Sequence, residues 1–219
     1  MMRLSLSEVA RITGGRLYGT DGIVTGVCTD SRQPLPGGLF IALRGPRFDG
    51  HAFAGPDLPA GALLVERPVT STLPRVEVAD TRRALADLAA AWRRRCTAAV
   101  VALTGSNGKT TVKEMLAAIL RSVGPVLATR GNLNNELGVP LTLLGVSPGD
   151  RFAVIEMGAN HAGEIAGLTA LAAPDVALIT NAGPAHLEGF GSVEAVARAK
   201  GEIFSGLAPD GVAVINADD

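Results

Sequence analysis

The most constraining feature of this chain is a glycine-rich turn that joins an apolar run to an amphipathic segment. The apolar residues 98–103 lead directly into the sequence Gly105-Ser106-Asn107-Gly108-Lys109-Thr110-Thr111. Beyond this turn, apolar side chains recur at helical spacing, at Val112, Met115, Leu116, Ile119 and Val123. The pattern predicts a strand, a tight turn and a helix, with Lys109 and Thr110 on the helix's first turn and Lys109 off its apolar stripe.

The residue types in this turn suit a bound phosphate. A helix N-terminus presents unpaired N–H groups and the positive end of the helix dipole. Gly105 and Gly108 allow the backbone to approach a ligand closely, Lys109 supplies a positive charge, and the Thr110 hydroxyl can ligate Mg²⁺. The general phosphate-loop pattern has a glycine where this chain has Leu103, so the loop is a shorter G-x-x-G-K-T variant. We predict that this turn binds a nucleotide phosphate; the alternative is an ordinary strand-to-helix turn.

The bulk composition excludes several classes of protein. The 219 residues carry a formal net charge of −1 and only 4% are aromatic, which argues against nucleic acid or an anionic membrane as the main partner. Cys28 and Cys96 lie far apart without a CxxC motif, which fits a reducing compartment. No apolar run approaches the ~20 residues of a membrane-spanning helix. We expect a cytoplasmic, monomeric protein with no nucleic-acid partner and no membrane span.

The chain consists of two regions that differ in their sequence pattern. Residues 1–81 combine a helix near residues 7–14, capped by Ser7, with short β-like runs between Gly and Pro turns. A helix that opens at Asp80 connects this region to the next. From residue 98, apolar runs alternate with helical stretches, which is typical of a parallel sheet covered by helices on both faces. We predict an α/β fold: a small mixed α/β N-terminal domain, residues 1–81, and a P-loop-type parallel-sheet ATP-binding domain, residues 82–219.

Polar side chains follow two of the apolar runs in the second region. Ligands of parallel sheets gather outside the carboxyl ends of the strands. Glu156 ends the run 152–155, where its carboxylate can face Thr110 and hold Mg²⁺; the alternative is a solvated acid at a strand end. Asn181 and His186 lie in the loop after the run 176–179, and His186 is either a ligand or a surface residue.

Lys200 is the most unusual residue of the second region. It lies on the apolar stripe of a helix that Ser192 caps, seven residues after Val193 and four before Phe204. Such a lysine usually extends to water. It can instead provide charge for a phosphate or carboxylate, or react with CO₂ to form a carbamate, whose oxygens suit Mg²⁺. The asparagine-rich segment 131–140 can either cap the next helix or bind ligand oxygens.

Several motifs taken together, in order and at compatible spacing, resemble the Mur ligase family along nearly the whole chain. Within that family, the likeness is greatest to the enzymes that add D-alanyl-D-alanine to UDP-N-acetylmuramoyl-tripeptide. The short phosphate loop is that family's own form. The motifs that carry the resemblance are Thr29-Asp30-Ser31-Arg32, residues 36–45, Phe48-Asp49-Gly50-His51, residues 104–115, residues 131–144, residues 156–160, residues 181–190 and Lys200-Gly201-Glu202.

The resemblance implies particular residue roles. Residues 105–111 would bind ATP, with Thr110 and Glu156 on one Mg²⁺. His186 and a carbamylated Lys200 would serve a second Mg²⁺ near the substrate carboxylate. Asn135 would be a catalytic residue that contacts the phosphate or the carboxylate. The uridine end of the substrate would be bound by Ser31, Arg32, Asp49, Gly50 and His51.

The implied activity is ATP-dependent amide-bond formation in peptidoglycan precursor synthesis, through an acyl phosphate. Family members are roughly twice as long and carry a third, amine-binding domain, so we expect this polypeptide alone not to complete the ligation. Three alternatives are a sister ligase that adds a different residue, a non-catalytic nucleotide or UDP-sugar binding module, and a P-loop kinase or GTPase. The asparagine-rich segment and the loop 183–190 argue against the sister ligase, and the absence of an N-K-x-D motif argues against a GTPase.

Overall fold

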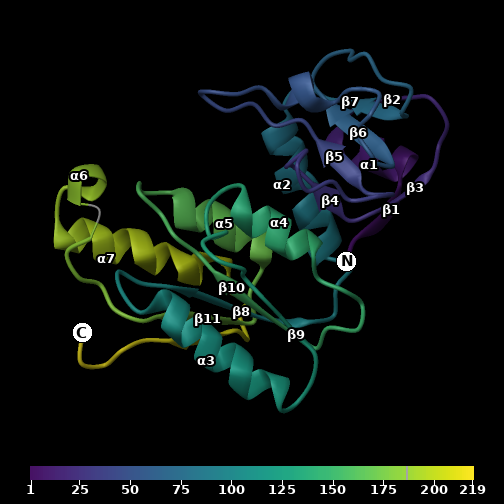
Figure 1. The fold of residues 1–219 in the computed structure, drawn as a ribbon. Helices are drawn as coiled ribbons and strands as arrows, with labels where there is room; N and C mark the ends of the chain where they lie inside the picture. The colour runs from purple at the N-terminus through teal and green to yellow at the C-terminus, as the bar shows by residue number, and fades with distance from the viewer. Residues whose placement is uncertain (186) are drawn as a thin grey trace. The chain divides into compact units, whose positions relative to one another are not determined.

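The computed structural model describes residues 1–185 and 187–219 and forms two compact units, Met1–Trp92 and Arg93–Asp219. Figure 1 shows both as mixtures of helices and strands, so the predicted α/β class is confirmed. The division falls after Trp92, so that the helix expected to connect the two domains belongs to the first unit except for its last residue, Arg93. Each unit is described by itself below.

The first unit is built on a five-stranded mixed sheet in the order β2-β7-β6-β5-β4. Strands β4 to β7 pair in parallel, and β2 pairs antiparallel with β7 at one edge. A separate antiparallel pair joins β1 to β3. The bounds of these strands are β1 Arg3–Ser5, β2 Arg16–Tyr18, β3 Ile23–Thr25, β4 Val27–Cys28, β5 Leu39–Ile41, β6 Ala62–Val65 and β7 Arg75–Glu77. Every residue of β5 and β6 is buried, so these central strands form the core of the unit.

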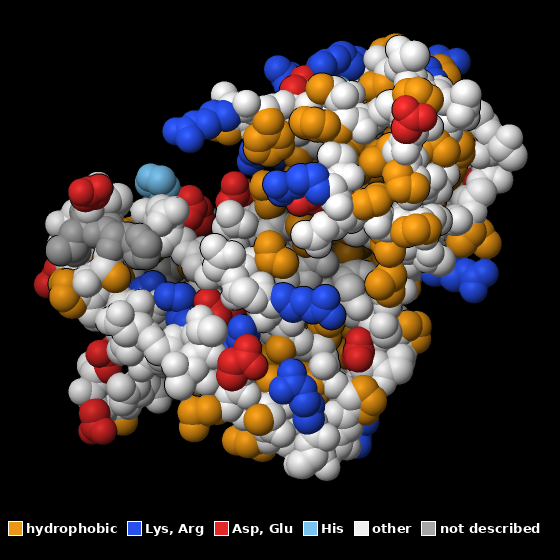
Figure 2. All heavy atoms as spheres, viewed as in Figure 1, with side chains coloured by type: hydrophobic (Ala, Val, Ile, Leu, Met, Phe, Trp, Pro, Cys, Tyr) orange, Lys and Arg blue, Asp and Glu red, His pale blue; other side chains and the backbone are white. Residues whose placement is uncertain are grey.

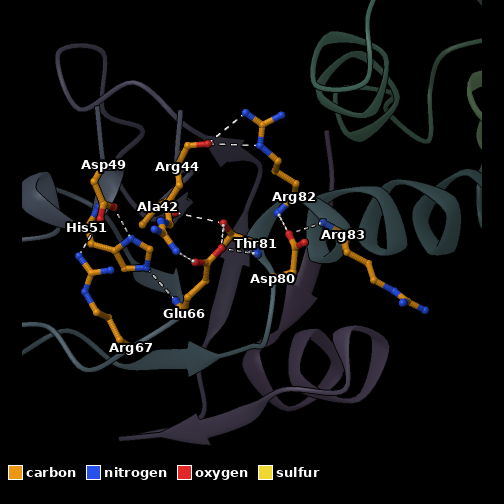
Figure 3. A network of polar contacts seen from close by, with 10 residues as sticks. All are labelled: Ala42, Arg44, Asp49, His51, Glu66, Arg67, Asp80, Thr81, Arg82 and Arg83. Carbon is orange, nitrogen blue, oxygen red and sulfur yellow. Dashed lines mark hydrogen bonds and ion pairs between the residues drawn. The ribbon is translucent and has the colours of Figure 1, made fainter. Parts of the chain in front are cut away.

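Side-chain caps fix the helices of the first unit. Helix α1, Leu6–Thr13, begins after Ser5, which forms a capping box with Glu8, so Ser7 is not its cap. Helix α2, Thr81–Arg93, follows Asp80, whose carboxylate accepts the N–H groups of Arg82 and Arg83 at 2.8 and 3.0 Å (Figure 3). A short 3₁₀ turn, η1, spans Gly50–Phe53.

The second unit contains a five-stranded parallel sheet in the order β12-β11-β8-β10-β9. The strands are β8 Ala99–Thr104, β9 Val126–Ala128, β10 Phe152–Glu156, β11 Val176–Ile179 and β12 Val212–Val214. The bounds of β8, β10 and β11 are close to the predicted runs 98–103, 152–155 and 176–179. In Figure 1, α3 lies on one face of this sheet, and α4, α5 and α7 lie on the other. The helices are α3 Lys109–Arg121, α4 Gly138–Leu144, α5 Glu164–Ala172, α6 Leu187–Phe190 and α7 Val193–Gly201, and α7 continues into the 3₁₀ turn η2, Glu202–Gly206. None of the helices formed by described residues is long and apolar enough to cross a membrane.

The face that helix α3 presents to the sheet is only partly the one predicted. Val112, Leu116 and Leu120 pack on a core around Leu103 and Val154. Lys113 and Ala117 are the buried residues of the helix, so Lys109, four residues before Lys113, lies on this inner face and not off it. The predicted stripe is wrong for Met115, Ile119 and Val123, which are 59%, 63% and 53% exposed. Hydrophobic side chains are visible at the surface over α3 in Figure 2.

Gly50 allows a close backbone contact in the first unit. A methyl group at Gly50 would lie 2.8 Å from both the backbone N and the backbone O of Leu43. Because backbone atoms cannot move aside cheaply, we expect Gly50→Ala to lower the free energy of unfolding by about 1–3 kcal/mol. Gly55→Ala is the matched control, because nothing lies within 4 Å of its added methyl group. Urea denaturation measures both variants, and equal stabilities would contradict the proposed clash.

Candidate functional site

The carboxyl end of β8 is the centre of the candidate site. β8 lies between β10 and β11, and both pair with it in parallel. Thr104 is paired with Ile179, and Leu103 with Glu156, so the three strands end at the same edge. This edge is where parallel sheets bind ligands. The loops that leave β8, β10 and β11 carry the polar residues that the sequence singles out.

The turn after β8 presents an uncapped helix N-terminus. Gly105 has φ +154°, and a methyl group there would collide with the Thr180 hydroxyl. Gly108 has φ +76° and is the N-cap of α3, without a side-chain cap hydrogen bond. The Lys109 ammonium donates to the carbonyl oxygens of Gly105 and Ser106 at 2.8 and 3.4 Å. The turn therefore offers backbone N–H groups and a lysine that is held by neutral acceptors, which suits an anion.

Thr110 and Glu156 meet as the sequence predicts. The Thr110 hydroxyl donates to one carboxylate oxygen of Glu156 at 3.0 Å, and the Asn134 amide donates to the other at 2.8 Å. Glu156 is only 2% exposed. Among the described residues there is no cluster of three or more His, Cys, Asp or Glu side chains that could hold a metal by itself. A hydroxyl beside one carboxylate nevertheless fits Mg²⁺, which takes few protein ligands and completes its shell with phosphates and water.

A buried lysine lies behind this carboxylate. Lys113 is 1% exposed, and its ammonium donates to the backbone oxygen of Thr129 at 2.8 Å and pairs with Glu114 at 3.0 Å. The hydroxyl of Thr129 in turn accepts the backbone N–H of Glu156 at 2.9 Å. The interior of α3 is thereby tied to the strand end that carries Glu156. The sequence signal was a lysine four residues after Lys109, on the same helix face.

The asparagine-rich segment brings a residue to Glu156 that the sequence did not single out, Asn134. The side-chain oxygen of Asn135 accepts the N–H groups of Leu137 and Gly138 at 3.2 and 2.9 Å, so it caps the start of α4. Its neighbour Asn134 contacts Glu156 and also accepts the N–H of Gly158 through its backbone oxygen, at 2.8 Å. The sequence spacing does not distinguish Asn134 from Asn135, because which of the two contacts Glu156 depends on the backbone conformation of the loop.

Lys200 is buried, as its position predicts. It is 3% exposed, in a row with Val196, Ala199 and Ile203. Desolvation and the nearby Lys109 ammonium lower the pKa of Lys200 to about 8. Within the described part of the chain, no group accepts a hydrogen bond from the Lys200 ammonium, and the buried Thr104 hydroxyl is likewise unpartnered. His186, the predicted companion of Lys200, lies outside the described residues.

The first unit holds Asp49 and His51 in a polar network (Figure 3). The His51 ring is buried: Nδ1 lies 2.6 Å from the Asp49 carboxylate, and Nε2 accepts the N–H of Glu66 at 2.8 Å. Arg67 also binds Asp49, at 2.7 Å, and the contacts with Arg67 and His51 lower the pKa of Asp49. Both nitrogens of His51 are therefore used inside the unit, and its ring fixes the loop that precedes η1.

Next to this network is a cavity of about 450 Å³. Three of the residues that line it, Ser31, Arg32 and Gly50, are predicted site residues. The others are Thr29, Asp30, Phe48 and Phe53. The guanidinium of Arg32 forms two hydrogen bonds with Asp30, at 2.9 and 2.7 Å, which lower the pKa of Asp30 to about 2. Phe48 and Phe53 are 59% and 52% exposed. The exposure of these two aromatic rings at the cavity, which the structure reveals, marks them as residues that can contact a ligand.

The chain belongs to the Mur ligase family. The model of the Mur ligase middle domain matches residues 103–219, which include the phosphate loop, Glu156 and Lys200. Two similar curated relatives are UDP-N-acetylmuramoyl-tripeptide–D-alanyl-D-alanine ligases: that of Escherichia coli is 54% identical, and that of Bacillus subtilis 40% identical. Both matches cover 100% of this chain. They cover 49% of the Escherichia coli protein and 50% of the Bacillus subtilis protein. The chain thus spans about half the length of these relatives.

Solved structures agree with this assignment. A crystal structure of MurF from Acinetobacter baumannii is 41% identical, with a TM-score of 0.91 over 98% of this chain and 49% of its own. MurF ligase from Thermotoga maritima, crystallised in complex with ADP, is 37% identical, with a TM-score of 0.80 over 90% of this chain and 46% of its own.

From the burial of Lys200 we predict how the stability of the folded chain depends on pH. Because its pKa is about 8 in the folded chain and higher in the unfolded chain, the folded state binds fewer protons from about pH 8 to 10. The free energy of unfolding should therefore rise with pH across this window, relative to a variant that lacks the Lys200 amine. In CO₂-free buffer, Lys200→Met should be more stable than the wild type at pH 7, and this advantage should shrink toward pH 10.

Urea denaturation at several pH values measures this difference. Arg198→Met, on the exposed side of α7, is the control and should show the same pH dependence as the wild type. A constant difference between wild type and Lys200→Met from pH 7 to 10 would contradict the prediction.

Proposed function

We propose that this chain is part of an ATP-dependent amide ligase of peptidoglycan precursor synthesis, which joins D-alanyl-D-alanine to UDP-N-acetylmuramoyl-tripeptide. The observation that carries the proposal is the 3.0 Å contact between Thr110 and Glu156 beside the uncapped N-terminus of α3. It combines a phosphate loop with a group suited to Mg²⁺, as ATP chemistry needs. The names of the relatives support the choice of substrates.

The proposed reaction has two steps. An oxygen of the tripeptide carboxylate attacks the γ-phosphorus of ATP, and ADP leaves to give an acyl phosphate. The amine of D-alanyl-D-alanine then attacks the acyl carbon; phosphate leaves and the nitrogen loses a proton. Mg²⁺, when bound, offsets the charge of the two anions that meet in the first step.

The residues of the second unit would orient these reactants. The N–H groups at the start of α3 would bind phosphate oxygens, and the Lys109 ammonium would exchange its carbonyl partners for a phosphate. Thr110 and Glu156 would hold the metal, with Asn134 fixing the carboxylate. Asn135 stays a candidate for contact with the substrate only through its amide nitrogen, because its oxygen caps α4.

Lys200 would act as a carbamate with His186 at a second Mg²⁺. Its lowered pKa favours the neutral amine, whose nitrogen attacks CO₂ and then loses a proton. The unpartnered hydroxyl of Thr104, likewise buried at this strand end, supports a further polar group there. Carbon-13 NMR in labelled bicarbonate tests the proposal, since the carbamate signal of the wild type should vanish in Lys200→Met.

The ligase proposal is tested by amide formation from the tripeptide substrate, ATP and D-alanyl-D-alanine. We propose to assay this chain and any longer product of the same gene. Preference for a single amino acid over D-alanyl-D-alanine would favour a sister ligase. Binding of ATP and UDP-sugar with no ligation by any product would favour a non-catalytic binding module.

Replacement of Lys109 should weaken nucleotide binding. Loss of a charge-assisted phosphate contact costs on the order of 1.5–3 kcal/mol, so Lys109→Ala should weaken ADP binding roughly ten- to hundredfold. Arg121→Ala, in the last turn of α3, is the control and should bind ADP like the wild type. Isothermal titration calorimetry at constant ionic strength measures both, and thermal unfolding shows that they are folded. Equal affinity of Lys109→Ala and wild type would overturn the phosphate-loop assignment.

The cavity of the first unit is proposed to bind the uridine diphosphate end of the substrate. Phe48 and Phe53 offer faces for a base, while Ser31 and Arg32 offer polar groups. We expect Phe48→Ala with Phe53→Ala, and separately Ser31→Ala with Arg32→Ala, each to weaken UDP binding at least fivefold. Ile23→Ala is a control of similar exposure outside the cavity. Unchanged affinity in both double variants would exclude this cavity as the uridine site.

A further inference from the structure

The segment 180–183, which leaves β11, is hydrogen-bonded to the phosphate loop along its length. The Thr180 hydroxyl donates to the backbone oxygen of Asn107 at 2.7 Å. The Ser106 hydroxyl donates to the backbone oxygen of Gly183 at 2.8 Å and accepts its N–H at 3.0 Å. The backbone N–H of Ser106 donates to the backbone oxygen of Asn181 at 3.0 Å. Two loops from neighbouring strands are thus joined through backbone groups.

Asn181 makes the most specific of these contacts. Its side-chain oxygen accepts the N–H of Asn107 at 3.0 Å, and its side-chain nitrogen donates to the backbone oxygen of Asn107 at 3.1 Å. One amide therefore satisfies both backbone groups of a single loop residue, which needs one donor and one acceptor side by side. Aspartate and leucine have a similar shape but cannot provide both at neutral pH.

These contacts decide which backbone groups remain for a phosphate. The N–H groups of Ser106 and Asn107 are already bound to Asn181. The N–H groups that follow, from Gly108 to Thr110, lie at the start of α3, where no side chain caps the helix. The arrangement directs the anion toward the helix N-terminus and Lys109, away from the tip of the loop.

We infer that Asn181 is a positioning residue for the phosphate loop: it holds Asn107 so that the N–H groups of residues 108–110 and Lys109 face the nucleotide phosphates. The inference rests on the proposed nucleotide site. It adds that the affinity of this site depends on a residue of the β11 loop that acts through the backbone of residue 107. The same contact joins the phosphate loop to the loop that leads to residue 186.

The variants Asn181→Leu and Asn181→Asp test this inference by calorimetry with ADP. Asn181→Leu loses both hydrogen bonds and should bind ADP about tenfold more weakly. Asn216→Leu is the matched control, because Asn216 donates at 3.4 Å to the backbone oxygen of Thr180 and makes no contact with the phosphate loop in the described structure. It should bind ADP within twofold of the wild type.

Asn181→Asp provides the readout that a merely structural role would not give. Above its pKa the aspartate lacks a donor and faces the backbone oxygen of Asn107, so binding should be weak at pH 8. When protonated it again offers one O–H donor and one acceptor, as the amide does. Because aspartate has an ordinary pKa of about 3.9, the ratio of its ADP dissociation constant to that of the wild type should fall at least threefold from pH 8 to pH 4. Taking this ratio cancels the titration of ADP and of charged neighbours such as Lys109 and Asp219, whose carboxylate accepts the N–H of Ala182.

The outcomes separate the inference from the function on which it rests. If the wild type binds ADP but Asn181→Leu binds equally well, the positioning role is wrong and the nucleotide site stands. A pH-independent ratio for Asn181→Asp would also overturn the role. If the wild type binds no ADP, the nucleotide site and this inference both fail. If Asn181→Leu proves unfolded by circular dichroism, the pH dependence of Asn181→Asp decides.

Discussion

The parallel pairing of β8 with both β10 and β11 is the constraint on which the candidate site depends. It places the ends of three strands at one edge, with the loop after β8 between the ends of the other two. Gly105 illustrates how close these loops are, because any side chain there would strike the Thr180 hydroxyl. The contact of Thr110 with Glu156 and that of Asn107 with Asn181 both follow from this arrangement.

Buried charge is the second constraint on this unit. Lys113, Glu156 and Lys200 are each at most 3% exposed, and burial of a charged group is unfavourable unless it is paired or hydrogen-bonded. Lys113 and Glu156 have such partners in Thr129, Thr110 and Asn134. Lys200 has none among the described residues, and its pKa falls instead. Two of the three buried charges are therefore held by hydrogen bonds, whereas the charge of Lys200 is disfavoured by its burial.

The sequence alone predicted the architecture well, because apolar runs and turn residues report directly on a parallel sheet. The run that became β11 has the predicted bounds, and the meeting of Thr110 with Glu156 followed from the rule for strand ends. The orientation of α3 was predicted only in part, because Met115 and Ile119 repeat at the same spacing as the inner residues, while the inner Lys113 is charged. Periodicity gives the presence of an apolar row, but packing decides which row faces the sheet.

Residues in loops were harder to assign, because their roles depend on backbone turns that the sequence does not reveal. Asn134 and Asn135 are adjacent and chemically identical, yet one binds Glu156 and the other caps α4. In the first unit, Asp49 and His51 lie beside the cavity but are bound to Arg67 and to the N–H of Glu66. Their contribution is to fix the loop that brings Phe48 and Gly50 to the cavity wall.

The charges at the end of β8 explain why an anionic ligand suits this edge. Among the described residues, the Lys109 ammonium donates to the carbonyl oxygens of Gly105 and Ser106, and it lies close enough to Lys200 to lower the pKa of that residue. Glu156 already accepts hydrogen bonds from Thr110 and Asn134 with its two oxygens. An incoming phosphate would therefore meet the Lys109 ammonium and an uncapped helix N-terminus. Because the carboxylate of Glu156 is already hydrogen-bonded, the positive groups of this edge are the ones that face a ligand, and they favour an anion.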